Sequence, residues 1–220
     1  MSNTDRDNKL SSRTASFGEA PEWASADWQK GDGLLPAIVQ DARNGQVLML
    51  GYMNEDAARK TMETGLVTFF SRSKNRLWTK GETSGNHLAF RGAKLDCDRD
   101  TILVQAVPSG PACHTGTRTC FDDDLPANAG FIAYLDELIS RRRAEMPEGS
   151  YTTSLFSDGA SRIAQKVGEE GVELALAHMK NDRQEIANEA ADLLFHMLVL
   201  LADADMSLDD AIAVLRQRHS

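Results

Sequence analysis

The sequence predicts an α+β protein of two domains, in which a mostly-β metal-binding domain precedes an all-α helical bundle. Up to about residue 120, short apolar segments rich in β-branched and aromatic residues alternate with turn residues, which is typical of strands. From residue 131 the apolar residues recur with the period of a helix. A stretch rich in Asp, Pro and Gly separates the two patterns. We therefore expect a flexible tail over residues 1–22, a first domain over residues 23–124 and a second over residues 131–220.

Composition excludes several kinds of partner. The chain has 220 residues, of which 41% are hydrophobic, and this is enough for real cores. A formal net charge of −9 argues against a nucleic-acid partner, because phosphate backbones are bound by basic surfaces. No apolar run approaches the roughly 18 residues that a membrane helix needs. Three cysteines and no signal peptide indicate a reducing compartment, so we expect a cytoplasmic protein without a membrane partner.

The first domain begins with a predicted β-hairpin. Asn44-Gly45 favours a tight turn between two apolar segments, and Asn54 and Gly65 are suitable residues to begin and end a short helix. Later apolar segments are separated by polar turns. We expect strands over residues 34–40, 47–52, 66–71, 77–80 and 95–107, and a helix over residues 55–64.

One segment of this domain concentrates both hard and soft metal ligands. Three aspartates are spaced two residues apart, and all three cysteines of the chain lie in the same segment. If residues 95–107 form one strand, alternation places the aspartates on one face and the first cysteine on the other. Carboxylates suit magnesium, whereas thiolates suit zinc. The candidate magnesium ligands are Asp96, Asp98 and Asp100, and the candidate zinc ligands are Cys97, Cys113 and Cys120.

The number of thiols bears on what the zinc site does. Three thiolates leave one position of a tetrahedral zinc open, which is typical of a catalytic site with a bound water. His114 follows Cys113 directly and is a candidate general acid or base beside such a water. Two alternatives remain open. The cysteines are ordinary reduced thiols, or His114 is a fourth ligand that closes a structural site.

A polar loop earlier in the domain is a candidate phosphate site. Residues 80–85 combine a lysine, two glycines and two hydroxyls, and such a loop binds phosphate through its backbone N–H groups. The basic turn at residues 72–76 raises the same question, since its charges are either solvated or bind a substrate phosphate. Trp78 either stacks on a purine or belongs to the core.

These motifs resemble those of phosphoribosyl-AMP cyclohydrolases over about residues 25–125. The resemblance is carried by residues 78–86, residues 95–100 and the segment from Cys113 through Phe121. It implies that the three aspartates hold magnesium and that the three cysteines hold zinc across a homodimer interface, with Cys97 from one subunit and the later pair from the other. It also implies substrate contacts at Trp78, Lys80 and Ser84.

The second domain is predicted to be helical throughout. A first apolar stripe begins at Phe131, and Pro147 and Gly149 separate it from residues 150–156. We expect a helix over residues 161–180, another over residues 182–204, and a last one that starts at Ser207 and Asp210. The result is an all-helical bundle.

Carboxylates lie on two of these helices where the pattern is otherwise apolar. Glu170 falls on the apolar stripe of its helix, so we expect it to face the interior. Buried carboxylates need a cation, and a divalent metal held between two helices is the simplest one. The alternative is a solvated acidic face. His196 shares a face with two of the acids, and we expect it to be a hydrogen-bonded core residue. The candidate ligands are Glu169, Glu170, Glu173, Glu189 and Asp192.

This pattern resembles the all-helical nucleotide pyrophosphohydrolases over residues 131–220. Residues 150–152 and 166–170 narrow the resemblance to phosphoribosyl-ATP pyrophosphohydrolase, and its position after a cyclohydrolase matches the fused bifunctional enzymes of histidine biosynthesis. The resemblance implies that magnesium on the acids helps to cleave phosphoribosyl-ATP to phosphoribosyl-AMP and pyrophosphate, with Arg162 and Lys166 as candidate phosphate contacts. Zinc-assisted hydrolysis then opens the purine ring between N1 and C6, with His114 as the candidate proton carrier.

Two other functions compete with this interpretation. A structural protein would join a zinc-stabilised β-domain to a helical dimerisation bundle without turnover, and it requires a fourth zinc ligand. A general nucleotide pyrophosphohydrolase would use only the helical domain, and it leaves the cyclohydrolase motifs without a purpose.

Overall fold

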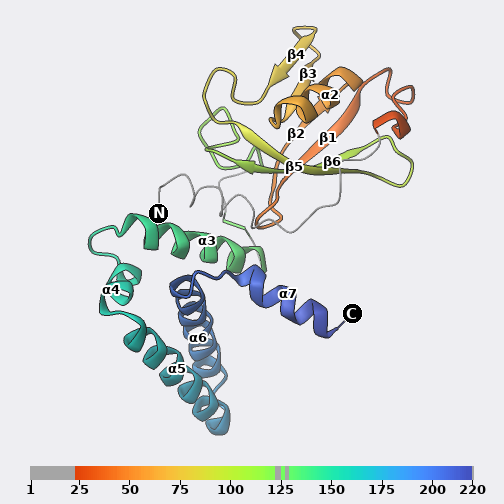
Figure 1. Cartoon of the computed structure of the whole chain (residues 1–220). Helices are drawn as coiled ribbons and strands as arrows, with labels where there is room; N and C mark the ends of the chain where they lie inside the picture. Colours follow the sequence, from red (N-terminus) through yellow and green to blue (C-terminus); the bar gives the residue numbers. More distant parts are fainter. Residues whose placement is uncertain (1–22, 122–124, 127–128, 220) are drawn as a thin grey trace. The chain divides into compact units, whose positions relative to one another are not determined.

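The computed structural model describes residues 23–121, 125–126 and 129–219 (Figure 1). The chain divides into two compact units, Met1–Gly130 and Phe131–Ser220. The tail expected over residues 1–22 and most of the expected linker lie outside the described residues. In the part of the chain that is described, no helix has the length and apolar character needed to span a membrane. The mostly-β first unit and the helical second unit confirm the predicted fold class.

The first unit contains a four-stranded sheet and a separate two-stranded hairpin. The large sheet has the order β2-β1-β6-β5, in which β1 runs antiparallel to β2 and parallel to β6 (Figure 1). The hairpin consists of β3 and β4. The elements are the 3₁₀ turn η1 (Trp23–Ser25), β1 (Leu35–Asp41), β2 (Val47–Met53), α2 (Glu55–Thr64), β3 (Thr68–Ser71), β4 (Arg76–Thr79), β5 (Leu88–Leu95) and β6 (Ile102–Pro108).

Strand β1 shows how the sheet and the cysteine loop are joined. Alternate residues of β1 are buried, and the last of them is Asp41. A buried carboxylate needs a partner, and Asp41 accepts hydrogen bonds from the Arg43 guanidinium at 2.8 and 2.9 Å. Arg118, which lies between the second and third cysteines, approaches the same carboxylate at 3.9 Å. These contacts hold the loop after β6 against the β1–β2 end of the sheet.

Helix α2 begins and ends as its sequence predicts. The Asn54 side chain accepts the backbone N–H of Ala57 at 2.9 Å, and Gly65 ends the helix in the left-handed conformation with φ 68°. Both cap predictions are confirmed. The helix packs against β2 and β3.

The single strand expected over residues 95–107 is wrong. Strand β5 ends at Leu95, β6 begins at Ile102, and a turn joins them. Arg99 takes a positive φ of 62° in this turn, a conformation that no strand residue adopts. Aspartate side chains that accept nearby backbone N–H groups favour such turns over strands. Strand β5 was not predicted, because it lacks β-branched residues and contains Gly92, where its register against β6 shifts.

The described residues of the second unit form five helices. They are α3 (Ala129–Glu145), α4 (Tyr151–Asp158), α5 (Ala160–Lys180), α6 (Arg183–Asp203) and α7 (Leu208–Arg218). Asn181 is left-handed with φ 57° and reverses the chain, so that α5 and α6 lie side by side (Figure 1). The start of α7 is confirmed, because Ser207 and Asp210 form a reciprocal capping box. Helix α4 was not predicted; Ser150 caps its eight residues, and only Thr152 and Leu155 are buried.

Candidate metal centres

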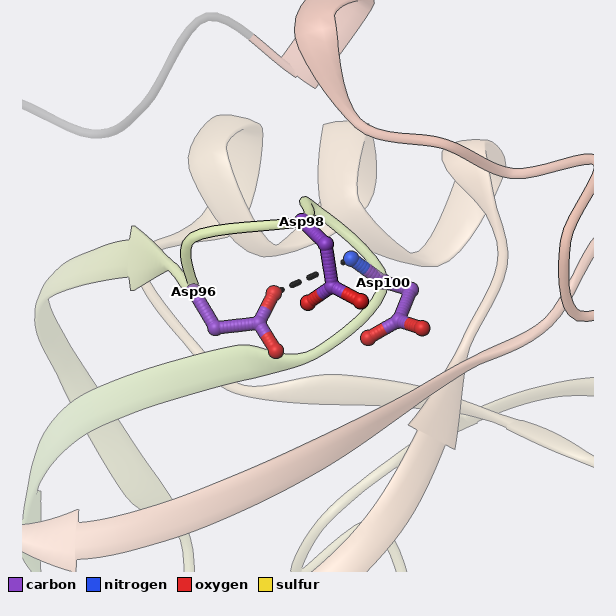
Figure 2. Close-up of side chains that lie close together, drawn as sticks. All are labelled: Asp96, Asp98 and Asp100. Atoms are coloured by element: carbon purple, nitrogen blue, oxygen red, sulfur yellow. Dashed lines mark hydrogen bonds between the residues drawn. The ribbon is translucent and has the colours of Figure 1, made fainter.

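Three aspartates of the first unit converge in the turn between β5 and β6 (Figure 2). Asp96, Asp98 and Asp100 each offer an oxygen within 4.8 Å of the others. The Asp96 carboxylate accepts the backbone N–H groups of Asp100 at 3.0 Å and Thr101 at 3.1 Å, and these bonds close the turn. The three side chains therefore converge through a turn and not through strand alternation, so that step of the sequence argument is wrong. Carboxylate oxygens grouped in this way suit a hard divalent cation.

The ammonium group of Lys30 lies in this cluster. Its Nζ is 2.5 Å from Asp98 Oδ2 and 2.5 Å from Asp100 Oδ2. The hydrogen bond from Lys30 lowers the pKa of Asp98, and the hydrogen bonds to Asp100 and Asp98 raise the pKa of Lys30. A positive charge held by two carboxylates shows that the donor set fits a cation. Sequence reasoning did not single out Lys30, because it lies on a distant segment of the chain.

We expect Lys30→Ala to strengthen binding of a divalent cation at the aspartates. The ammonium group competes with the cation for two of the three carboxylates, so its removal should lower the dissociation constant by roughly two- to tenfold at low salt. The difference should shrink as ionic strength rises. All three tryptophans of the chain lie in the first unit, so their fluorescence during a Mg²⁺ or Mn²⁺ titration reports on this unit alone. Lys60→Ala is the charge-matched control, and equal affinities in all three proteins would contradict the prediction.

Two of the three cysteines form a pair in the loop after β6. Cys113 and Cys120 lie close enough for their thiols to hydrogen-bond. The backbone N–H of Cys120 donates to the Leu48 carbonyl of β2 at 2.8 Å, which fixes this end of the loop on the sheet. Cys97 lies in the aspartate turn instead, and all three thiols are free. Among the described residues, no converging group of three or more metal-binding side chains includes a cysteine, so one chain does not complete the predicted three-thiol site.

The two paired thiols differ in acidity. The Thr115 hydroxyl donates to Cys113 Sγ at 3.0 Å, and this bond is the main reason that the pKa of Cys113 falls to about 6. Cys120 is exposed at the surface, yet partial loss of hydration and the neighbouring Cys113 raise its pKa. Burial lowers the pKa of Lys80, while the charges of Cys120 and Cys113 oppose that shift. Cys113 is thus the thiol most easily converted to the thiolate that zinc requires.

We expect Thr115→Val to slow alkylation of Cys113 by iodoacetamide about tenfold or more at pH 7 in the metal-free protein. With a pKa of about 6, Cys113 is mostly thiolate at pH 7, whereas an ordinary thiol near 8.5 is only a few per cent thiolate. The pH at which alkylation of Cys113 is half-maximal should move upward in the variant. The wild-type and variant rates should converge above about pH 9.5. Mass spectrometry of the labelled peptides measures the rates, and Cys97 in the same sample is the internal reference. A Cys113 midpoint near 8.5 in the wild-type protein would contradict the prediction.

The other predicted residues of the first unit differ in their surroundings, and only His114 has a direct contact with this pair. His114 is exposed, and its Nδ1 is 3.8 Å from Cys113 Sγ. Lys80 is buried, and its Nζ donates to the Asn86 carbonyl at 3.2 Å. Trp78 is half-buried and packs against Phe69 with ring centroids 5.6 Å apart. Ser84 is exposed, and its hydroxyl accepts the backbone N–H of Asn86.

A second acidic cluster joins α5 and α6 in the helical unit. Glu170, Glu173 and Glu189 each offer an oxygen within 4.8 Å of the others. Glu170 is only 5% exposed, as its place on the apolar stripe predicts. Partial loss of hydration, together with repulsion from Glu173 and Glu170, raises the pKa of Glu189. Three carboxylates held this close to one another favour a multivalent cation.

Two of the five predicted acids lie outside the converging group. Glu169 bonds to Gln165 at 2.6 Å and to Lys166 at 3.0 Å instead. Asp192 is exposed, although it is close enough to contribute to the raised pKa of Glu189.

Basic residues on α5 partly neutralise the cluster. Lys166 Nζ lies 2.7 Å from Glu170 Oε1, so the buried carboxylate already has one cationic partner. Arg162 is further away, 3.9 Å from Glu169. Lys166 therefore lies at the edge of the acidic cluster.

His196 is more deeply placed than its sequence context indicates. It is 3% exposed, and its Nε2 lies 3.7 Å from Glu170 Oε1. Its Nδ1 is buried and has no hydrogen-bond partner among the described residues, so the expectation of a hydrogen-bonded core histidine is not met. The apolar run around it in α6 predicted its burial, but not its approach to Glu170.

Comparisons with known proteins agree with both halves of this description. The family model for phosphoribosyl-AMP cyclohydrolase matches residues 49–122, and the model for phosphoribosyl-ATP pyrophosphohydrolase matches residues 132–219. The first match includes all three aspartates and all three cysteines. The second includes all five acids of the helical unit.

Several relatives are similar over nearly the whole chain, and each is named histidine biosynthesis bifunctional protein HisIE. The protein from Escherichia coli O157:H7 is 56% identical over 193 residues, which covers 88% of this chain and 95% of that one. The protein from Xanthomonas campestris pv. campestris is 55% identical over 210 residues, which covers 96% of this chain and all of that one. The protein from Vibrio vulnificus (strain YJ016) is 55% identical over 195 residues, or 88% and 92% of the two chains. The chain therefore belongs to the family of bifunctional histidine biosynthesis proteins, in which a phosphoribosyl-AMP cyclohydrolase precedes a phosphoribosyl-ATP pyrophosphohydrolase.

Proposed function

We propose that the two hydrolyses of this family take place at two separate sites, one in each unit. The helical unit cleaves phosphoribosyl-ATP to phosphoribosyl-AMP and pyrophosphate, and the first unit then opens the purine ring of phosphoribosyl-AMP. The observation that carries this proposal is that each unit has its own converging group of three carboxylates. We assign the ring opening to residues 23–124 and the pyrophosphate release to residues 131–220.

In the helical unit we assign the metal ligands to the acids of α5 and α6. Glu170, Glu173 and Glu189 form the centre of the site, since they already converge. Magnesium, when bound there, neutralises triphosphate charge and orients a water molecule for hydrolysis. Glu169 and Asp192 lie beside the group and join it through side-chain rotation. Lys166 and Arg162 then contact the phosphates.

In the first unit we assign zinc to the three thiols of two subunits. Cys113 and Cys120 of one chain form a ready pair, whereas Cys97 lies in a separate turn, so a second copy supplies the third ligand. Zinc, when bound, provides a Lewis acid with one open position. The protein is accordingly a homodimer. Its free thiols also agree with a reducing, cytoplasmic location.

The chain's own residues handle the proton in the ring opening. The oxygen of a water molecule attacks C6 of the purine and loses a proton, and the C6–N1 bond breaks as N1 gains one. His114 is our candidate to take the first proton and return it to N1, because its ring is exposed beside Cys113. Trp78, Lys80 and Ser84 are the candidate substrate contacts. Asp96, Asp98 and Asp100 would hold magnesium, which would supply a charge to bind substrate phosphate or to order the site.

One experiment tests the two-site proposal directly. Purified protein with Zn²⁺ and Mg²⁺ is given phosphoribosyl-ATP, and pyrophosphate release and the absorbance of the ring-opened product are followed together. We expect both products, with pyrophosphate first. Pyrophosphate alone, in protein with zinc fully bound, would contradict a catalytic first unit and support a structural zinc domain.

A further inference from the structure

A cavity of about 240 Å³ opens on the β3–β4 hairpin, apart from the thiols and the aspartate turn. It combines a half-buried tryptophan, two hydroxyls, two basic side chains and one acid. The residues that line it are Ser71, Lys74, Arg76, Trp78, Glu82 and Thr83. Of these, only Trp78 belongs to the contacts assigned above.

The charges in this cavity favour an anion. Arg76 donates to Glu82 at 2.5 Å and to the Leu77 carbonyl at 2.8 Å, so its charge is offset by one acid. Lys74 is exposed, and among the described residues no carboxylate pairs with it. One acid against two bases leaves one net positive charge. In a chain with a net charge of −9, a positive cavity is a selective place for a phosphate.

The hairpin that carries the cavity is also connected to the segment of the later two cysteines. Residues two apart in a strand point to the same side, so Arg76 and Trp78 of β4 share one face. The hydrogen bonding between the two strands of the hairpin continues one residue beyond them, because the backbone N–H of Lys80 donates to the Val67 carbonyl at 3.0 Å. Lys80 begins the loop of residues 80–87, and the backbone N–H of Ser109, which lies shortly before Cys113, donates to the His87 carbonyl of this loop at 3.0 Å. Glu82 and Thr83 of the same loop line the cavity, so one loop joins the cavity to the segment that carries Cys113.

We propose that this cavity binds one terminal ribose phosphate of phosphoribosyl-AMP, with Lys74 and Arg76 on the phosphate and Trp78 against the ribose or base. This inference rests on the ring-opening function proposed above. The substrate carries a phosphorylated ribose on either side of its purine, so one arm reaches the cavity while the ring lies at the thiols. The Ser71 and Thr83 hydroxyls provide further hydrogen bonds to phosphate oxygens.

The test measures ring opening of phosphoribosyl-AMP, so that the helical unit does not contribute. In Lys74→Ala and Arg76→Gln, we expect KM to rise about 10- to 100-fold for each lost charge-assisted bond, with kcat changed less than about threefold. Inorganic phosphate should inhibit the wild type competitively, and its inhibition constant should rise at least about tenfold in both variants. Arg59→Ala on α2 removes a charge outside the cavity and should leave both values unchanged.

The possible outcomes separate this inference from the function on which it rests. Unchanged KM and unchanged phosphate inhibition in both cavity variants would overturn the phosphate site while the ring-opening function stands. An equal KM increase in Arg59→Ala would overturn it too, since general attraction of an anionic substrate would then explain the effect. A wild-type protein that opens no ring would contradict the proposed function itself.

Discussion

Cys97→Ala is expected to lower the rate of ring opening at least about 1000-fold, because a lost zinc ligand removes several kcal/mol of Lewis-acid stabilisation. Pyrophosphate release from phosphoribosyl-ATP should stay within about twofold of wild type, since no thiol lies among residues 131–220. The second activity of the same chain is therefore the control for folding. Zinc content measured on the purified variant should fall in parallel with ring opening.

A mixing experiment tests whether zinc is shared between subunits. Cys97→Ala and Cys113→Ala should each be inactive alone as cyclohydrolases. When the two are co-expressed, half of the dimers contain one copy of each, and in these one of the two sites recovers all three thiols. Ring opening should then return to about a quarter of the wild-type rate. No recovery in isolated mixed dimers would show that each chain builds its own site, and the shared zinc would be wrong.

Glu170→Gln is expected to lower pyrophosphate release at least about 100-fold. Loss of a residue that only orients a metal ligand costs about 10- to 100-fold in metal affinity or activity, so loss of a ligand at the buried centre of the cluster should cost no less. The substitution keeps the shape of the side chain and removes its charge, and Lys166 retains Glu169 as a partner. The measurement is pyrophosphate release across a range of Mg²⁺ concentrations.

Two controls make this second result specific. Ring opening of added phosphoribosyl-AMP should be unchanged, because that reaction belongs to the first unit. Glu185→Gln makes the same chemical change on α6, where Glu185 pairs with Lys180 at 3.0 Å outside the acidic cluster, and it should keep full activity. If Glu170→Gln releases pyrophosphate at the wild-type rate, the assignment of the helical cluster is wrong.

Local signals in the sequence were enough to predict most elements of the structure. Asn54 and Gly65 act within one helix, and Ser207 and Asp210 act within one turn, so their capping bonds follow from adjacent residues. Glu170 could be placed inside the bundle because its spacing from apolar neighbours fixes its face on the helix. Where such local signals were weak, as in β5 with its glycine and without β-branched residues, the prediction failed.

The sequence by itself determined the order of the two domains, the fold class and the family, because these depend on hydrophobic period and on motifs of neighbouring residues. The tertiary structure decided which side chains meet. Lys30 reaches Asp98 and Asp100, Arg118 approaches Asp41, and His196 approaches Glu170. The aspartates converge through a turn where strand alternation was expected. The contacts of Lys30 and His196 join residues far apart in the chain. They depend on how strands pair and helices pack, which no local pattern specifies.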